Sequence, residues 1–306
     1  MKLLATLGAF IFSGLVYAAP IHNIVIFGDS LSDNGNLYEI MKHQLPPSPP
    51  YFQGRFSNGP VWIEHLAASY FSDPAAHLQD YAIGGAGVSE EPGDEELFTL
   101  KREVETYLVA NQDKASEDSL FVVWIGANNY LGMPPDVEPT LQKVNAGITH
   151  SLQRLVEKGA KHILVVNLPD LGKSPAAIEF DSVDTFTYFS NQHNAALDKT
   201  LGDLKQSNPD VDWLFFDMHQ VFKDTIDHPS DYGFTNITSS CYNSALDDSS
   251  KKSVLKLVAS VRLQKSFDAC DGFLFFDLVH PTESAHKILA DKARIILDAS
   301  GLEFVE

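Results

Sequence analysis

The sequence has few cysteines, few basic residues and only one long apolar run. Its 306 residues include two cysteines, and 22 lysine and arginine residues face 41 aspartate and glutamate residues, which gives a net charge of −19. This charge would repel a phosphate backbone, so nucleic acid is not an expected partner. No cluster of carboxylates and histidines has the spacing of metal ligands, so we expect neither a metal site nor metal-dependent hydrolysis.

The long apolar run lies at the N-terminus and has the pattern of an export signal. Lys2 precedes an apolar stretch over residues 3–16, and Val16-Tyr17-Ala18 fits a small-residue cleavage site. The run is shorter than the roughly 20 residues that a membrane-spanning helix needs. We therefore expect residues 1–18 to be a signal peptide, with an uncleaved anchor as the alternative. The mature chain would be secreted, by way of the periplasm in a Gram-negative bacterium.

The two cysteines, Cys241 and Cys270, bound a segment near the C-terminus. In an oxidising compartment we expect them to form a disulfide, and a pair of free buried thiols is the alternative. Between them lie five basic and three acidic residues, a net charge of +2, with hydrophobic residues at roughly helical spacing. A basic amphipathic helix can lie on a membrane surface or act as a lid, although packing against the domain explains the pattern equally well.

Short runs rich in Val, Ile and Phe alternate with longer amphipathic stretches. Buried strands are predicted at residues 23–27, 120–125, 162–167 and 213–216. Helices are predicted at residues 60–71, 97–111, 140–158 and 185–206, and from Pro281 or Thr282 to about residue 297. This alternation predicts an α/β fold in three layers, with a central parallel sheet covered on both faces. We expect residues 19–306 to form a single domain in which residues 241–270 are an insertion.

Ligands of open parallel sheets bind beyond the carboxyl ends of the strands, so the residues after each strand are candidates for a site. Ser30 follows the first strand on a turn where its hydroxyl can meet a base, although helix capping is an alternative role. Gly84 and Gly85, after a second short strand, can present a backbone N–H to a ligand or simply form a tight turn. Asn128, after the next strand, can donate its side-chain amide to an oxyanion or cap a helix.

Asp277 and His280 lie three residues apart near the C-terminus. A carboxylate at this spacing can reach the imidazole across one turn, fix its tautomer and stabilise the imidazolium, whereas the alternative is a surface ion pair. His219 follows the last predicted strand and is a rival base, but it lacks the Asp-x-x-His spacing. Ser30, His280 and Asp277 are therefore the candidate nucleophile, base and orienting carboxylate.

These four motifs, in this order, resemble those of the GDSL lipases within the SGNH hydrolases, over essentially the whole mature chain. Residues 55–62, Arg-Phe-Ser-Asn-Gly-Pro-Val-Trp, add to the resemblance, which is strongest to secreted bacterial lysophospholipase A and its acyltransferase relatives. It implies a flavodoxin-like SGNH-hydrolase fold, no cofactor, and Ser30, Asp277 and His280 as catalytic residues. It also implies an oxyanion hole made by the Ser30 and Gly85 N–H groups and the Asn128 side chain. One departure is Asn129, where the family often has Asp.

The resemblance implies a serine esterase that hydrolyses lysophospholipids through an acyl-enzyme, with phospholipase A or acyl transfer as side activities. Its partner would be a lysophospholipid or phospholipid at a membrane or micelle surface. Acyltransferase relatives carry a disulfide loop whose proteolysis raises activity, so a protease that cuts within residues 241–270 is a further expected partner. Two other functions stay open: a short-chain or carbohydrate O-acetyl esterase on the same fold, and a non-catalytic binding module.

Overall fold

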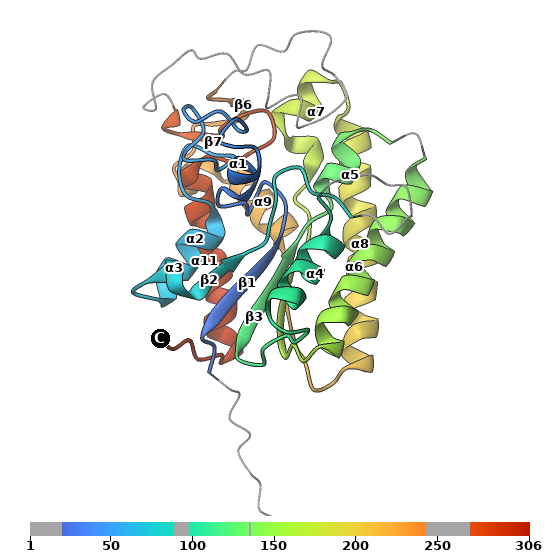
Figure 1. The fold of residues 1–306 in the computed structure, drawn as a ribbon. Coiled ribbons are helices and arrows are strands. Elements are labelled where there is room, and N and C mark those ends of the chain that lie inside the picture. Colours follow the sequence, from blue (N-terminus) through green and yellow to red (C-terminus); the bar gives the residue numbers. More distant parts are fainter. Residues whose placement is uncertain (1–19, 89–97, 135, 243–269) are drawn as a thin grey trace, which may run out of the picture.

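A five-stranded sheet with helices on both faces forms the centre of the computed structural model (Figure 1). The structure describes residues 20–88, 98–134, 136–242 and 270–306. The expected signal peptide at residues 1–18 and the basic amphipathic stretch between the cysteines lie outside the described residues. Within the described part of the chain, no helix is long and apolar enough to cross a membrane.

All strands of the central sheet are parallel, in the order β2-β1-β3-β4-β5. They are β1 (Asn23–Gly28), β2 (Leu78–Asp80), β3 (Ser119–Trp124), β4 (His162–Val166) and β5 (Asp212–Phe216). This strand order is that of the flavodoxin-like folds. The predicted three-layer α/β/α fold is therefore confirmed.

Two groups of helices cover the two faces of the sheet (Figure 1). One face carries α2 (Trp62–Tyr70) and α11 (Glu283–Ser300), and the other carries α4 (Leu100–Ala110), α6 (Val137–Glu157) and α8 (Val183–Ser207). The remaining described α-helices and strands are α1 (Asn36–Ile40), α3 (Pro74–His77), α5 (Ala127–Leu131), α7 (Pro175–Glu179), α9 (Met218–Asp227), and the parallel strand pair β6 (Asn236–Ser240) and β7 (Phe273–Phe275).

Alternate residues of β1, β3, β4 and β5 pack into different cores. In β1, Val25 and Phe27 lie in the core under α4, α6 and α8, whereas Ile24 and Ile26 lie in the core under α2 and α11. Both faces of the strand are thus buried. A parallel strand buried on both sides has a nearly continuous apolar sequence, which is the pattern that predicted these strands.

Helix starts differ from prediction by a few residues because of their caps. The helix predicted from residue 60 begins at Trp62, since the Glu64 carboxylate accepts the Val61 N–H at 2.9 Å. The last helix begins at Glu283, because Thr282 is its N-cap and the Thr282 hydroxyl accepts the Ala285 N–H. The helix predicted from Pro281 or Thr282 therefore begins one or two residues later than predicted.

Cys241 and Cys270 form a disulfide, with their Cα atoms 5.0 Å apart, so the prediction of a disulfide is confirmed. The bond lies just beyond β6 and just before β7. Two backbone hydrogen bonds extend this pairing, from the Cys241 N–H to the Phe275 carbonyl and from the Tyr242 N–H to the Phe276 carbonyl. The base of the insertion is therefore attached to the residues that immediately precede Asp277.

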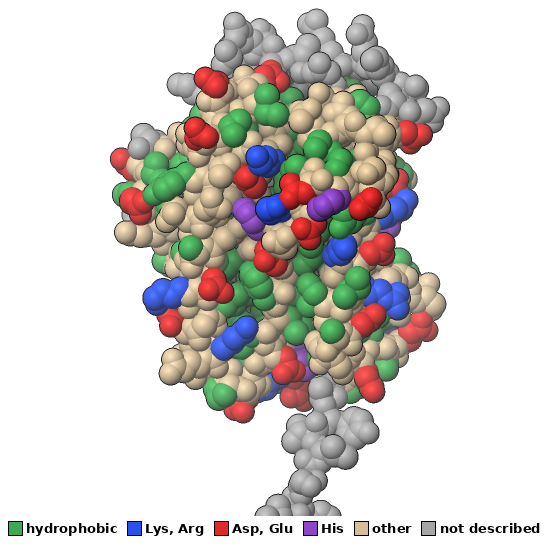
Figure 2. All heavy atoms as spheres, turned by 180° about the vertical axis from the view of Figure 1, so that it is seen from behind, with side chains coloured by type: hydrophobic (Ala, Val, Ile, Leu, Met, Phe, Trp, Pro, Cys, Tyr) green, Lys and Arg blue, Asp and Glu red, His purple; other side chains and the backbone are tan. Residues whose placement is uncertain are grey.

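The face turned away in Figure 1 carries charges of both signs. Figure 2 shows acidic and basic side chains interspersed over this face, with hydrophobic side chains between them. The net negative charge of the chain is therefore not gathered into one acidic patch on this face.

Candidate active site

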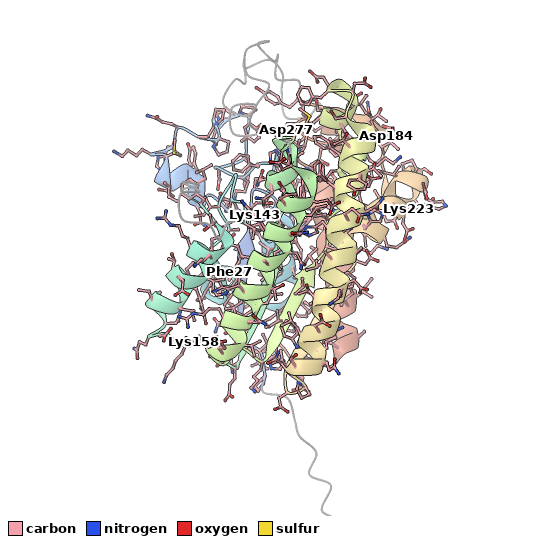
Figure 3. The ribbon with its side chains drawn as sticks, turned by 90° about the vertical axis from the view of Figure 1, so that its right-hand side faces the viewer. Phe27, Lys143, Lys158, Asp184, Lys223 and Asp277 are labelled. Atoms are coloured by element: carbon pink, nitrogen blue, oxygen red, sulfur yellow. A yellow bond between two sulfur atoms is a disulfide. The ribbon has the colours of Figure 1, made fainter. Side chains whose placement is uncertain are left out.

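The structure brings Ser30, His280 and Asp277 together beyond the carboxyl end of the sheet. Ser30 lies on the turn after β1, while Asp277 and His280 lie between β7 and α11. His280 Nε2 is 2.8 Å from Ser30 Oγ, and His280 Nδ1 is 2.7 Å from Asp277 Oδ2. Figure 3 shows Asp277 at one end of the molecule, beyond Phe27 of the sheet. All three residues are buried: Ser30 is 5% exposed, His280 2% and Asp277 4%.

The Asp277 carboxylate is held by its own loop. Its Oδ1 accepts the backbone N–H groups of Val279 at 2.9 Å and His280 at 2.7 Å. Burial alone would raise the pKa of Asp277, but the charge of His280 and the hydrogen bonds from His280 and Val279 outweigh it and lower that pKa below its usual value. An ionised Asp277 favours the tautomer of His280 that carries its proton on Nδ1. Nε2 is then free of a proton and can accept the Ser30 hydroxyl proton.

A side chain that sequence reasoning missed also contacts the candidate carboxylate. The Tyr51 hydroxyl donates to Asp277 Oδ2 at 2.7 Å. Burial, and then the neighbouring Asp277, raise the pKa of Tyr51 well above its usual value, so the phenol keeps its proton and acts as a donor. Nothing in the sequence links the two residues, because Tyr51 follows a proline-rich loop 226 residues before Asp277.

Asp33 connects the Ser30 turn to the glycine turn after β2. Its Oδ1 accepts the Gly35 N–H, and its Oδ2 accepts the Gly84 N–H, both at 2.7 Å. Because the Gly84 N–H is committed to Asp33, the neighbouring Gly85 N–H is the better candidate for an oxyanion donor. Gly85 has a φ of 80°, a left-handed conformation that favours glycine.

The Asn128 side chain lies at the other edge of this glycine turn. Its Nδ2 donates to the Ala86 carbonyl at 2.8 Å, which occupies one of the two amide hydrogens and leaves the second for a ligand. Asn129 pairs twice with Val88, accepting its N–H at 2.9 Å and donating to its carbonyl at 3.2 Å. An aspartate could not make the second bond, so the departure from the family pattern at Asn129 has a structural role here.

Four more carboxyl groups lie around the end of β1: Asp29, Asp33 and Glu103 are buried, and Asp80 is half-buried. Burial raises the pKa of Asp29 and of Asp33 to about 6, and it raises the pKa of Asp80 and of Glu103 well above the usual range. Glu103 Oε2 accepts the Gly28 N–H at 2.8 Å, two residues before Ser30. These groups connect the strand ends that carry the Ser30 and glycine turns.

The rival base, His219, lies at the start of α9. Its Nδ1 is 3.4 Å from Asn194 Nδ2, and its backbone N–H donates to Asn167. Among the described histidines, His280 is the one that makes a hydrogen bond to Ser30 Oγ. The described part of the chain also contains no group of three or more His, Cys, Asp or Glu side chains placed to hold a metal ion.

Comparisons with known proteins agree with this geometry. The profile of one protein family, GDSL-like lipase/acylhydrolase, matches residues 24–293. A phosphatidylcholine-sterol acyltransferase from Aeromonas hydrophila is 32% identical over 309 residues, which cover 90% of each chain. A secreted effector protein from Salmonella typhimurium is 28% identical over 276 residues, or 88% of this chain and 62% of that protein.

Solved structures share the fold at much lower sequence identity. A carbohydrate acetylesterase from Sinorhizobium meliloti aligns with a TM-score of 0.51 over 91% of this chain and 99% of that chain, with 11% sequence identity. At this identity the similarity concerns the fold alone.

Proposed function

Because the chain belongs to the GDSL-like lipase/acylhydrolase family, we propose that it is an exported serine esterase that hydrolyses the acyl ester of lysophospholipids. The observation that carries the proposal is the continuous set of hydrogen bonds from Ser30 Oγ through His280 to Asp277. A hydroxyl, an imidazole and a carboxylate in this order form the arrangement that serine esterases use to activate a nucleophile.

The first half of the reaction forms an acyl-enzyme. His280 Nε2 takes the hydroxyl proton as Ser30 Oγ attacks the ester carbonyl, and the carbonyl oxygen becomes an oxyanion. The Ser30 and Gly85 N–H groups and the second amide hydrogen of Asn128 stabilise that oxyanion. The intermediate then breaks its bond to the alcohol oxygen, which leaves with the proton from His280.

The second half of the reaction releases the acyl group. A water molecule attacks the acyl-enzyme carbonyl and gives one proton to His280 Nε2. When the Ser30 Oγ–acyl bond breaks, that proton returns to Ser30 and the fatty acid leaves. An alcohol in place of water would make the same step an acyl transfer. The 32% identical relative named a phosphatidylcholine-sterol acyltransferase supports such transfer as a side activity.

An apolar cavity beside the catalytic residues supports a lipid acyl group as substrate. It has a volume of about 40 Å³ and is bordered by Leu31 and Pro281, which directly follow Ser30 and His280. Met218, Phe222 and Leu289 also line it, and none of its described lining residues carries a charge. The cavity is much smaller than a long acyl chain, so its wall would contact only the carbons nearest the ester, and an apolar wall suits these better than the hydroxylated ring of a sugar.

Exposed apolar side chains near the site support a substrate presented by a membrane or micelle. Met133, Ile178 and Val183 are all more than a third exposed, and Ile178 reaches 51%. Ile178 belongs to α7, whose Ala176 N–H donates to the carbonyl of Leu278, between Asp277 and His280. These side chains would meet a lipid surface beside the site.

Export is supported by two observations. The disulfide Cys241–Cys270 is of a kind that persists in oxidising compartments outside the cytoplasm. One relative carries the description of a secreted effector protein. We propose that residues 1–18 act as the export signal, and that a protease which cuts within residues 241–270 raises the activity.

The proposal is tested by covalent labelling together with a substrate panel. An organophosphonate should label the wild-type protein once per chain, Ser30→Ala should abolish the label, and Ser32→Ala, on the same turn, should retain it. Persistent stoichiometric labelling of Ser30→Ala would identify a different nucleophile.

The panel compares long-chain lysophosphatidylcholine, diacyl phosphatidylcholine and acetylated sugars, each with and without added sterol. Release of long-chain fatty acid at a higher kcat/KM than acetate is the expected result. Preference for the acetylated sugars would replace the lipid substrate with a carbohydrate ester. Binding without any turnover would leave the non-catalytic binding module.

A further inference from the structure

The geometry points to Tyr51 as a positioning residue for the esterase reaction, which keeps the proton on His280 rather than on Asp277. This inference rests on the proposed serine esterase mechanism and adds a fourth group to it. Tyr51 does not touch the reacting atoms, so it would act through Asp277 alone.

Asp277 Oδ2 is shared by two donors. It accepts the Tyr51 hydroxyl at 2.7 Å and faces His280 Nδ1 at the same distance, while Oδ1 accepts the two backbone N–H groups of its own loop. Each hydrogen bond to a carboxylate spreads its negative charge and makes the group less basic. The Tyr51 hydrogen bond therefore makes Oδ2 less basic, and Oδ2 is also the oxygen that faces His280 Nδ1.

The position of the phenol is set by aromatic packing. Tyr51 is 1% exposed, and its ring packs edge-on against Phe276 at 5.1 Å and Phe56 at 6.0 Å between ring centroids. Phe56 in turn lies 5.1 Å from the His280 ring. A phenylalanine at position 51 can keep these contacts, so the hydroxyl can be removed without emptying the space around Asp277.

The consequence concerns the strength of His280 as an acid and base. His280 must take a proton from Ser30 and then give it to the leaving alcohol, so it must not hold that proton too tightly. Without the Tyr51 hydroxyl, Asp277 would carry more negative charge at Oδ2 and would stabilise the imidazolium more strongly. The base would then stay protonated, and inactive, up to a higher pH.

Other titratable groups face the same pair and stay unchanged when only the hydroxyl is removed. Asp29 and Ser30 approach His280 from the turn after β1, and His286 approaches it from α11. Tyr242, beyond β6, interacts with Tyr51. A difference between the wild type and a variant without the hydroxyl therefore reports on the Tyr51–Asp277 bond.

The test is the pH dependence of kcat/KM for a soluble p-nitrophenyl butanoate, measured with the full chain. In Tyr51→Phe the acid limb should move upward by about 0.5–1 pH unit, so that kcat/KM on that limb falls roughly 3- to 10-fold while the alkaline plateau changes little. A merely structural role would lower kcat/KM at every pH without moving the limb, and that result would overturn the inference.

A second variant keeps the inference testable if Tyr51→Phe fails to fold. Replacement of Tyr51 by 3-fluorotyrosine retains the ring and makes the phenol a stronger donor, so the acid limb should move to lower pH. An unmoved limb in this variant contradicts the inference.

A matched control is Tyr107→Phe, which removes another buried tyrosine hydroxyl, one that accepts the Ser116 N–H. The limb should not move in this control, and a shift equal to that of Tyr51→Phe would contradict the inference. Activity that survives in Ser30→Ala would instead remove the proposed function itself, whatever the Tyr51 variants show.

Discussion

Carboxyl groups lie on both sides of Ser30, and their pKa values are shifted differently on the two sides. On one side, Asp277 takes hydrogen bonds from Tyr51, Val279 and His280, and its pKa is lowered. On the other side, burial outweighs the hydrogen bonds at Asp29, Asp33, Asp80 and Glu103, and the pKa of each is raised. The carboxyl pKa values are therefore shifted in opposite directions on the two sides.

The difference shows what a buried carboxyl needs for its pKa to be lowered. Backbone hydrogen bonds alone do not suffice, because Asp33 also accepts several N–H groups and its pKa still rises to about 6. Asp277 has in addition a direct side-chain hydrogen bond from His280, so that both this bond and the charge of His280 lower its pKa. In the proposed mechanism the lowered pKa keeps Asp277 ionised beside the imidazolium of His280, whereas Asp33 and Glu103 accept N–H groups of the turns next to the proposed oxyanion donors.

The largest expected effect comes from removing the charge on the ionised side. Asp277→Asn should lower kcat by about 10⁴, because a neutral amide neither fixes the His280 tautomer nor stabilises the imidazolium. Steady-state turnover of a short-chain ester measures this effect. Glu103→Gln is the matched control on the opposite side and should lose less than about tenfold in kcat, since the glutamine oxygen can still accept the Gly28 N–H. Equal losses of kcat in Asp277→Asn and Glu103→Gln would show that the carboxyl groups on the two sides do not differ in this respect.

A smaller effect is expected at the oxyanion donors. Asn128→Ala should lower kcat by about 10²–10³, the usual result of losing one donor to a tetrahedral oxyanion. Asn111→Ala, which removes an amide at the end of α4, is the control. A wild-type rate in Asn128→Ala would take this residue out of the oxyanion hole.

The smallest expected effect concerns stability and has opposite signs on the two sides. The pKa of Asp29 is raised from 3.8 to about 6, so its contribution to stability is fully present below its unfolded value and is lost as the pH rises through about 6. Asp29→Asn should therefore gain unfolding free energy relative to the wild type between about pH 4 and pH 7, by about 1–3 kcal/mol.

Urea titrations at several pH values measure this difference. For Asp277, whose pKa is lowered, the sign reverses, because its contribution is present at neutral pH and is lost as the pH falls through the folded value. The same sign for Asp29→Asn and Asp277→Asn would show that the pKa shifts on the two sides do not differ in direction.

Much of the candidate site could be predicted from sequence, because its parts lie in short motifs at strand ends. Ser30 and Asn128 each follow a buried strand whose apolar run is easily recognised, and the spacing of Asp277 and His280 is local. The Tyr51 contact could not be predicted, since it depends on how a proline-rich loop packs on a segment 226 residues away. The raised pKa values of Asp80 and Glu103 depend on burial of their carboxyl groups, and the sequence does not show which carboxyl groups are buried.

The strands and helices also include some that could be predicted from the sequence and some that could not. The four strands of the predicted sheet were recognisable because both of their faces are buried. The pair β6 and β7 was not predicted, because most of β6 is only partly buried and its sequence, Asn-Ile-Thr-Ser-Ser, lacks a continuous apolar run. The short helix α7 has only five residues, too few to show a helical period.

The disulfide between Cys241 and Cys270 has a consequence for any cut made between these residues. The two ends of the segment stay joined by a covalent bond with 5.0 Å between their Cα atoms. A cleaved chain would therefore migrate as one species on a denaturing gel without reductant, and as two fragments once the bond is reduced. The smaller fragment would carry Asp277 and His280, and the larger one would carry Ser30. The cleaved protein would therefore keep all three residues in one covalently joined molecule.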